Sequence, residues 1–345
     1  MRFLIFAAQP KPKLAVYLFG VIPHNERMVY FVGAGCGAAD LITVRGMRLL
    51  ESADVIIYAG SLVNPELLQY AKEGCAVHNS ALMTLDEVIS VIKQADSDNK
   101  TVVRLHTGEP SVYGAVREQM DELDALGIRY ESCPGVTACF GAAASLNLEY
   151  TLPDVSQTLI ITRMEGKTAV PSAESIESLA AHHASMAVYL SAGMTEELSR
   201  RLIAGGYSAE TPAAIVYKAT WCDERKFVCT VGTLPEVAAE HGITKTAVIL
   251  VGDCIAHSGC AADGTSFGSR AGVAGMADAP LSAEPLSSAN PCENAESAFS
   301  AGAASPSAAH SGYSKSRLYS PDFETEFRKK RVSENTCNPD TESRQ

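Results

Sequence analysis

The chain has 345 residues, with 28 lysines and arginines against 40 aspartates and glutamates, and therefore a formal charge of −12 at pH 7. At roughly 150 residues per domain this length predicts two domains. The acidic balance argues against nucleic-acid binding, which needs basic surface to neutralise phosphates. No stretch approaches the roughly 20 apolar residues of a membrane helix. Ten cysteines without a C-x-x-C pair indicate reduced thiols of a cytoplasmic protein.

Residues 1–27 are predicted to be an N-terminal extension, because Pro10–Lys13 interrupts their apolar runs. From Met28 onward, short apolar runs alternate with helical stretches. The expected strands are 29–32, 55–58, 101–106 and one near Tyr130; the expected helices are 43–52, one opening at Pro65, 84–95, 113–126 and an Ala-rich helix ending at Leu146. Apolar strands separated by helices predict an N-terminal α/β domain over 28–154 with a mostly parallel sheet.

The rhythm changes after Pro153. Five strands are expected at 158–164, 187–190, 213–217, 227–231 and 247–251, with helices at 175–182, 196–204 and 234–241. Strands 213–217 and 227–231 are joined without a helix, which predicts antiparallel pairing in a mixed sheet. Residues 155–255 are therefore predicted to form a second α/β domain.

Beyond residue 255 the composition shifts to alanine, serine, glycine and proline. Such a segment buries too little apolar surface to offset the entropy of ordering it, so 256–315 is predicted to be a disordered insert. Aromatic residues return in 316–331, which predicts an ordered tail segment, and 332–345 is predicted to be a disordered C-terminus.

The first motif is glycine-rich and runs from Gly33 to Thr43, after a strand and before a helix. The glycines at 33, 35 and 37 suggest a dinucleotide-binding turn. The third glycine nevertheless comes one residue too early, and no acidic residue closes the second strand. The alternative is a tight strand–helix turn in which Asp40 or Thr43 caps the helix.

Two further motifs also follow predicted strands. His106–Gly114 places Glu109 between a glycine and a proline, at the sheet edge where open α/β sheets bind ligands. Pro134–Ala138 opens the Ala-rich helix, and Thr137 either donates a hydroxyl hydrogen bond to a ligand or caps the helix. Each motif alone is ambiguous.

Taken together, the three motifs resemble the tetrapyrrole (corrin/porphyrin) methyltransferases, which use S-adenosyl-L-methionine. Segments 58–64, 149–153, 155–163 and 215–221, with the tail residues 316–319 and 326–329, are similar to a branch that methylates a corrin-ring precursor in cobalamin synthesis. The resemblance covers roughly residues 28–255 and 316–330. It implies two α/β domains with the cofactor in the cleft between them, a homodimer, and a tetrapyrrole substrate. No metal site and no dedicated base are expected.

The resemblance also implies cofactor contacts, carried over position by position. They are Gly35 and Cys36 in the first loop, Thr107, Gly108, Glu109 and Val112 in the second, Thr137 and Ala138 in the third, and Leu190, Ala219 and Ala247 in the second domain. The chain departs from the commoner pattern at Cys36, where relatives often have proline, and at Glu109, where many have aspartate.

The tetrapyrrole carries several carboxylates, and four basic residues are candidate partners, each alternatively a solvated or structural charge: Arg45, Arg104, Lys218 and Arg225. Three other functions remain open. They are another corrin-ring or uroporphyrinogen methyltransferase, a nicotinamide oxidoreductase, which the glycine spacing disfavours, and a non-catalytic tetrapyrrole-binding protein.

Overall fold

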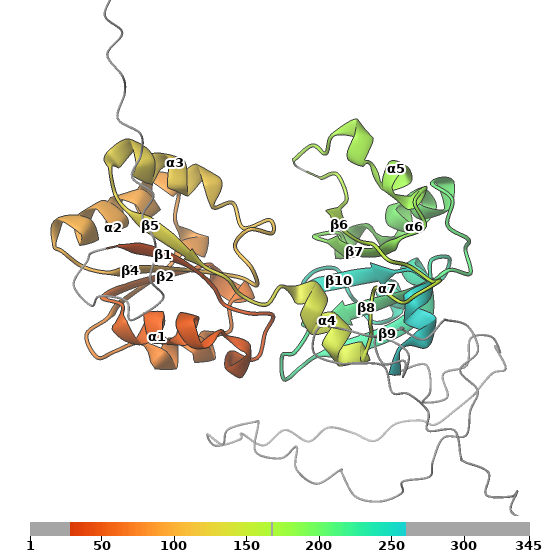
Figure 1. Cartoon of the computed structure of the whole chain (residues 1–345), viewed down its shortest axis with the longest axis horizontal. Coiled ribbons are helices and arrows are strands. Elements are labelled where there is room, and N and C mark those ends of the chain that lie inside the picture. The colour runs from red at the N-terminus through yellow and green to blue at the C-terminus, as the bar shows by residue number, and fades with distance from the viewer. Residues whose placement is uncertain (1–27, 167, 260–345) are drawn as a thin grey trace, which may run out of the picture.

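The computed structural model describes residues 28–166 and 168–259. Two five-stranded sheets, each covered by helices, form two α/β units that follow one another along the chain (Figure 1). This arrangement confirms the predicted fold class. The predicted extension at 1–27, nearly all of the 256–315 insert, and the segments 316–331 and 332–345 lie outside the described residues. No helix in the described ranges is long and apolar enough to cross a membrane.

The first sheet has the strand order β3-β2-β4-β1-β5, and every neighbouring pair is parallel. Its strands are β1 (Val29–Gly33), β2 (Val55–Tyr58), β3 (Ala76–Asn79), β4 (Val102–His106) and β5 (Tyr130–Cys133). One face packs against α1 (Val44–Ser52), and the other against α2 (Leu85–Ser97) and α3 (Arg117–Leu126). The carboxyl ends of all five strands therefore lie at one edge, from which the three loops emerge.

The structure of this unit differs from the sequence-based expectations at three places. The edge strand β3 was missed because it is short and partly exposed, so it leaves no apolar run. The helix expected to begin at residue 113 begins at Arg117, because Tyr113 and Ala115 have left-handed φ angles of 56° and 49° that a right-handed helix excludes. The helix expected at Pro65 is a 3₁₀ helix, Pro65–Tyr70.

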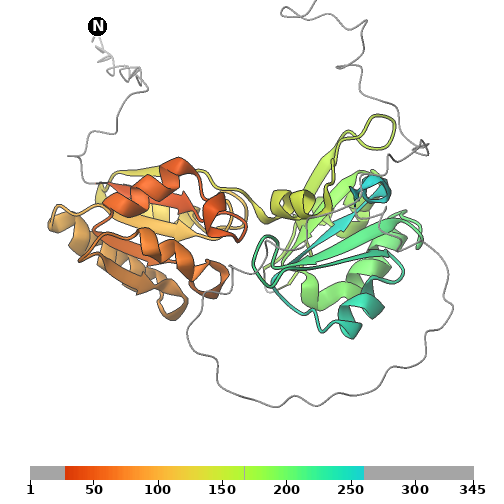
Figure 2. The ribbon, with the colours of Figure 1, turned by 90° about the horizontal axis from the view of Figure 1, so that it is seen from below.

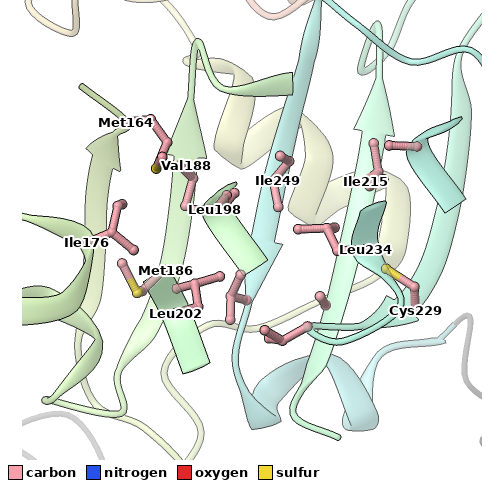
Figure 3. Packing of buried hydrophobic residues seen from close by; sticks show 14 of the residues in the cluster. Met164, Ile176, Met186, Val188, Leu198, Leu202, Ile215, Cys229, Leu234 and Ile249 are labelled. Carbon is pink, nitrogen blue, oxygen red and sulfur yellow. The ribbon is translucent and has the colours of Figure 1, made fainter. Parts of the chain in front are cut away.

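The second sheet has the order β6-β7-β10-β8-β9 and mixes one parallel pair with three antiparallel pairs, as predicted. Its strands are β6 (Leu159–Arg163), β7 (Ser185–Tyr189), β8 (Pro212–Tyr217), β9 (Arg225–Thr230) and β10 (Ala247–Val251). One face packs against α5 (Ile176–Ala180), α6 (Thr195–Ala204) and α7 (Leu234–Glu240) around the core shown in Figure 3.

Helix α4 (Ala138–Leu146) covers the opposite face of the second sheet. Its buried Cys139, Ala142 and Leu146 share a cluster with Ala187 of β7 and Val216 of β8. The chain therefore passes from one sheet to the other at residues 134–137, where a connecting segment runs between the units in Figures 1 and 2. Packing groups α4 with the second unit, ahead of the domain change predicted at residues 154–155.

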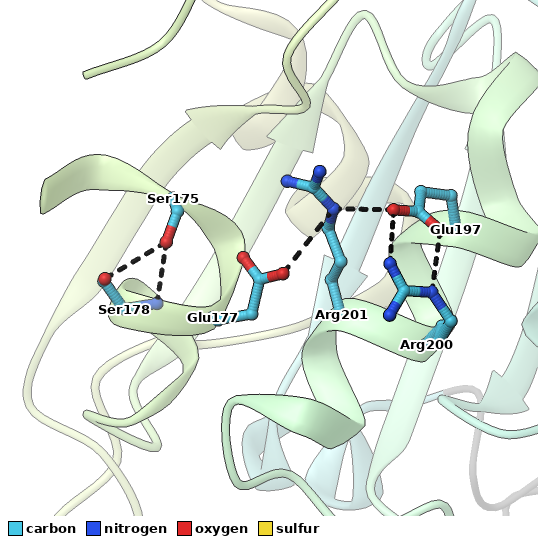
Figure 4. Close-up of polar contacts among 6 residues, drawn as sticks. All are labelled: Ser175, Glu177, Ser178, Glu197, Arg200 and Arg201. Carbon is cyan, nitrogen blue, oxygen red and sulfur yellow. Dashed lines mark hydrogen bonds and ion pairs between the residues drawn. The ribbon is translucent and has the colours of Figure 1, made fainter. Parts of the chain in front are cut away.

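An ionic cluster ties α5 to α6 on the face away from α4 (Figure 4). Glu197 accepts hydrogen bonds from Arg200 at 2.6 Å and Arg201 at 2.8 Å, and Arg201 also lies 3.6 Å from Glu177. The two arginines hold the pKa of Glu197 down at about 2. Because these side chains are largely exposed, solvent screens the pairs and they contribute little to stability.

Candidate functional site

Three glycines bring the three predicted loops together at the carboxyl edge of the first sheet. Gly33 ends β1, Gly108 follows β4, and Gly135 follows β5. A Cβ atom on Gly33 would lie 2.6 Å from both the Gly108 carbonyl oxygen and the Gly135 Cα. A Cβ on Gly135 would lie 2.2 Å from that same oxygen. Only glycine permits backbones to approach so closely, so the glycines here are required by loop packing.

Glu109 fastens the second loop to the third. One carboxylate oxygen accepts a hydrogen bond from the Ser111 backbone N–H at 3.0 Å, and the other accepts from the Gly135 N–H at 2.8 Å. Gly108 in turn pairs with Gly35 of the first loop through both backbone groups, at 3.1 and 3.3 Å. The side chain of Glu109 therefore fixes the relative position of the two loops expected to hold the cofactor.

The third loop is anchored by Tyr189, at the end of β7 in the second unit. Its hydroxyl is 2.7 Å from Thr137 Oγ1 and accepts the Cys139 backbone N–H at 2.7 Å. Thr137 occupies the N-cap position of α4 but makes no capping bond itself, so Tyr189 satisfies the helix terminus. Burial raises the pKa of Tyr189, which keeps the phenol neutral near pH 7. Sequence reasoning missed this residue, because only the fold brings positions 137 and 189 together.

The first loop packs on the second unit. Cys36 is buried and accepts a hydrogen bond from Thr220 Oγ1 at 3.4 Å, and the Ala38 N–H donates to the same hydroxyl at 3.0 Å. A Cβ on Gly37 would lie 2.4 Å from the ring of Trp221. Gly33 and Gly37 therefore pack closely against other parts of the protein, which favours the tight-turn interpretation over a dinucleotide fingerprint. Thr43 is the helix cap, accepting the Gly46 N–H at 3.1 Å.

Leu190, Ala219 and Ala247 lie at a single edge of the second sheet. Leu190 follows β7, Ala219 follows β8, and Ala247 begins the antiparallel strand β10. Leu190 is 66% exposed and has a φ of 54°, although it is neither glycine nor asparagine. Three residues after β8 and before β10 also have left-handed φ angles: Lys218, Thr220 and Thr246. Strained, open backbone of this kind is typical of ligand-binding edges.

The structure separates the four basic candidates. Arg104 is buried under α3, where it donates to the Gln119 side chain at 2.9 Å and to the Ile57 carbonyl at 3.0 Å. Burial lowers its pKa to about 10, and of the two alternatives for Arg104 the structure supports the structural charge, because the fold encloses it. The other three are accessible but engaged: Arg45 is 3.8 Å from Glu131, Lys218 is 2.6 Å from Asp223, and Arg225 lies over the Tyr217 ring.

His106 lies beneath the second loop at the end of β4. It is 3% exposed and stacks on Phe31, and its Nε2 has no hydrogen-bond partner within the described ranges. Burial, with a smaller contribution from the Arg104 charge, lowers its pKa to about 3. The imidazole is therefore neutral and belongs to the packing that supports the loop.

Comparison with known proteins agrees with this architecture. The sequence of residues 28–235 matches the family model of the tetrapyrrole (corrin/porphyrin) methylases. A cobalt-precorrin-4 C(11)-methyltransferase of Methanocaldococcus jannaschii is 50% identical over 231 residues, which cover 67% of this chain and 89% of that protein. The crystal structure of a cobalt precorrin-4 methyltransferase, a cobalamin biosynthetic enzyme, is 43% identical with a TM-score of 0.65, covering 68% of this chain and 99% of the other.

A more distant structure shows the fold alone. The uroporphyrin-III C-methyltransferase of Thermus thermophilus, solved with S-adenosylhomocysteine, is 23% identical with a TM-score of 0.57, covering 66% of this chain and 98% of the other. The fold is that of a two-unit α/β protein, and the family match makes it a methylase. The chain belongs to the tetrapyrrole (corrin/porphyrin) methylase family.

Proposed function

We propose that this protein is an S-adenosyl-L-methionine-dependent C-methyltransferase that acts at C11 of precorrin-4 or cobalt-precorrin-4 in cobalamin (vitamin B12) biosynthesis. The main support is the high identity, with 89% coverage, to a relative named for that reaction. The joined loops after β1, β4 and β5 supply a preorganised edge for the cofactor, directly attached to the second unit through Tyr189.

We propose that S-adenosylmethionine binds at the loop junction. Thr107 is exposed just after β4, and the buried, left-handed Gly108 beside it holds the second loop against Thr137 of the third. Leu190 offers an exposed apolar side chain at the facing edge. We propose that Gly35, Cys36, Thr107, Gly108, Glu109, Val112, Thr137 and Ala138 line one side of the cofactor, with Leu190, Ala219 and Ala247 on the other.

The bound cofactor supplies an activated methyl group on a sulfonium. The chain's own task is to align a ring carbon with that methyl and to exclude water. The Glu109 bonds hold two loops in place, and Tyr189 fixes the helix terminus behind them. Preorganisation of this kind lowers the entropic part of the barrier without a proton-transfer residue, and we assign no base.

We further propose a cytoplasmic enzyme that works as a homodimer. Seven cysteines in the described ranges are free thiols, as expected for a reducing compartment.

The decisive experiment combines purified protein, methyl-labelled S-adenosylmethionine and precorrin-4, with and without cobalt. We expect label in the corrinoid, at C11 by NMR, and the faster of the two substrates identifies the physiological one. Label at another ring carbon would favour a different corrin methyltransferase. Corrinoid binding without label would favour a non-catalytic binding protein.

Calorimetry tests the cofactor separately. S-adenosylhomocysteine should bind with micromolar or better affinity, about −8 kcal/mol. Saturable binding of a nicotinamide dinucleotide with no response to S-adenosylhomocysteine would refute the proposal and support an oxidoreductase.

A further inference from the structure

Arg163 ends β6 beside Tyr189 and was not among the basic candidates. In the parallel β6–β7 pair, Arg163 is the register partner of Tyr189, so the two side chains leave the same face of the sheet. Leu159 and Ile161 precede Arg163 on that face and pack in the cluster that α4 covers. Arg163 therefore follows this face to the N-terminus of α4, where Thr137 of the third loop contacts Tyr189.

Among the described residues, the guanidinium of Arg163 has only neutral hydrogen-bond partners. It donates to the backbone carbonyls of Met164 at 3.3 Å, Thr168 at 3.2 Å and Ala169 at 3.2 Å. Within the described parts of the chain it forms no ion pair, unlike Arg45 and Lys218. A guanidinium carries five N–H donors, so part of its donor capacity and its whole charge remain available. Its side chain is half-buried, which reduces screening by water.

Tyr113 reaches this place from the first unit. It follows the second loop directly, and its ring centroid lies 5.7 Å from that of Tyr189. The Tyr113 ring remains accessible to a ligand, since the residue is 44% exposed. Burial raises the pKa of Tyr113, while the Arg163 charge acts against that rise and the Glu174 charge adds to it. The exposed ring of Tyr113 therefore packs on Tyr189, whose register partner on β6 is Arg163.

We infer that Arg163 binds a peripheral carboxylate of the tetrapyrrole substrate while the macrocycle packs against Tyr113. The inference rests on the proposed function. A guanidinium fork matches a carboxylate in two parallel hydrogen bonds, and a flat conjugated ring system packs well on a tyrosine. A protein of net charge −12 must hold a polycarboxylate through local cations, and Arg163 is a cation that forms no ion pair with any described carboxylate.

The test is a titration of Arg163→Gln with uroporphyrin III, a stable porphyrin with carboxylates around its ring, followed by fluorescence. We expect binding about 10- to 100-fold weaker than in the unchanged protein, the range of a hydrogen bond to a charged group. The affinity for S-adenosylhomocysteine should change less than twofold. Arg200→Gln is the matched control, because Arg200 is an exposed arginine on α6, on the face away from α4.

Two further measurements distinguish direct binding of a substrate carboxylate by Arg163 from a structural role of its hydrogen bonds to Met164, Thr168 and Ala169. Arg163→Lys keeps the charge and removes the fork, so it should retain more porphyrin affinity than Arg163→Gln. Added salt should weaken porphyrin binding more steeply in the unchanged protein than in Arg163→Gln. Unchanged porphyrin affinity in Arg163→Gln would overturn the inference. So would a parallel loss of porphyrin and S-adenosylhomocysteine affinity with a lower melting temperature in both variants. Failure of the proposed function would instead appear as absent methyl transfer in the unchanged protein.

Discussion

Removing the Glu109 carboxylate should loosen the junction of the second and third loops. In Glu109→Ala, the Gly135 and Ser111 backbone N–H groups both lose their acceptor. Glu109→Gln keeps the shape but turns an amide N–H toward one of these donors, so one of the two bonds is lost. Glu109→Asp shortens the side chain by a single methylene and keeps the carboxylate, so we expect it to cost much less.

The magnitude follows from the exposure of the two bonds. A hydrogen bond to a charged acceptor contributes about 1.5–3 kcal/mol, and the bond to Gly135 is partly buried while the bond to Ser111 is exposed. We therefore expect Glu109→Ala to lower the free energy of unfolding by about 2–3 kcal/mol. For a protein of this size that lowers the melting temperature by roughly 4–12 °C. Because the cofactor must then order the loops, its affinity should fall by about one to two decades.

The assay is thermal unfolding and calorimetric titration of S-adenosylhomocysteine on all three variants. A lower melting temperature with an affinity loss under threefold would refute a role of Glu109 in cofactor binding and leave it a purely structural residue. A large affinity loss without any change in stability would refute the loop clasp and indicate direct contact with the cationic end of the cofactor.

Three more variants test the same framework. In the unfolded chain His106 has a pKa near 6.5, whereas burial lowers its pKa in the folded chain to about 3. The neutral imidazole therefore contributes its full stabilisation above pH 6.5, and this contribution is lost as the pH falls toward 3. Between pH 7 and pH 5, urea unfolding should show that the free energy of unfolding falls by about 2 kcal/mol less in His106→Leu than in the unchanged protein. The same pH dependence in both proteins would contradict the burial argument. Gly135→Ala places a methyl 2.2 Å from the Gly108 oxygen, so we expect at least about 1–3 kcal/mol of destabilisation; wild-type melting would refute the close packing. Tyr189→Phe removes the bonds to Thr137 and Cys139 and should lower stability by about 1–3 kcal/mol and weaken cofactor binding; an unchanged titration would show that the anchor does not reach the cofactor.

The sequence alone predicted nine of the ten strands that the described residues contain, and the position of the three loops. Apolar runs bounded by glycine and proline report local structure, since each strand buries its own residues. The same patterns predicted the mixed pairing of the second sheet, because β8 and β9 follow each other without a helix. The edge strand β3 escaped, since an exposed strand of four residues has no apolar signature. The start of α3 was misplaced because the left-handed φ of Tyr113 is imposed by its surroundings.

The tertiary structure alone decided which side chains serve the site. Nothing local distinguishes Arg104, which is enclosed between a sheet and α3, from Arg163, which is half-buried at the end of β6 beside Tyr189. The pairing of Thr137 with Tyr189 spans 52 residues, and α4 packs on the second sheet although it follows the first along the chain. Periodicity and turn chemistry act over a few residues, whereas burial and charge pairing depend on which distant segments meet. The sequence therefore predicted the positions of the three loops but not the distant residues that contact them.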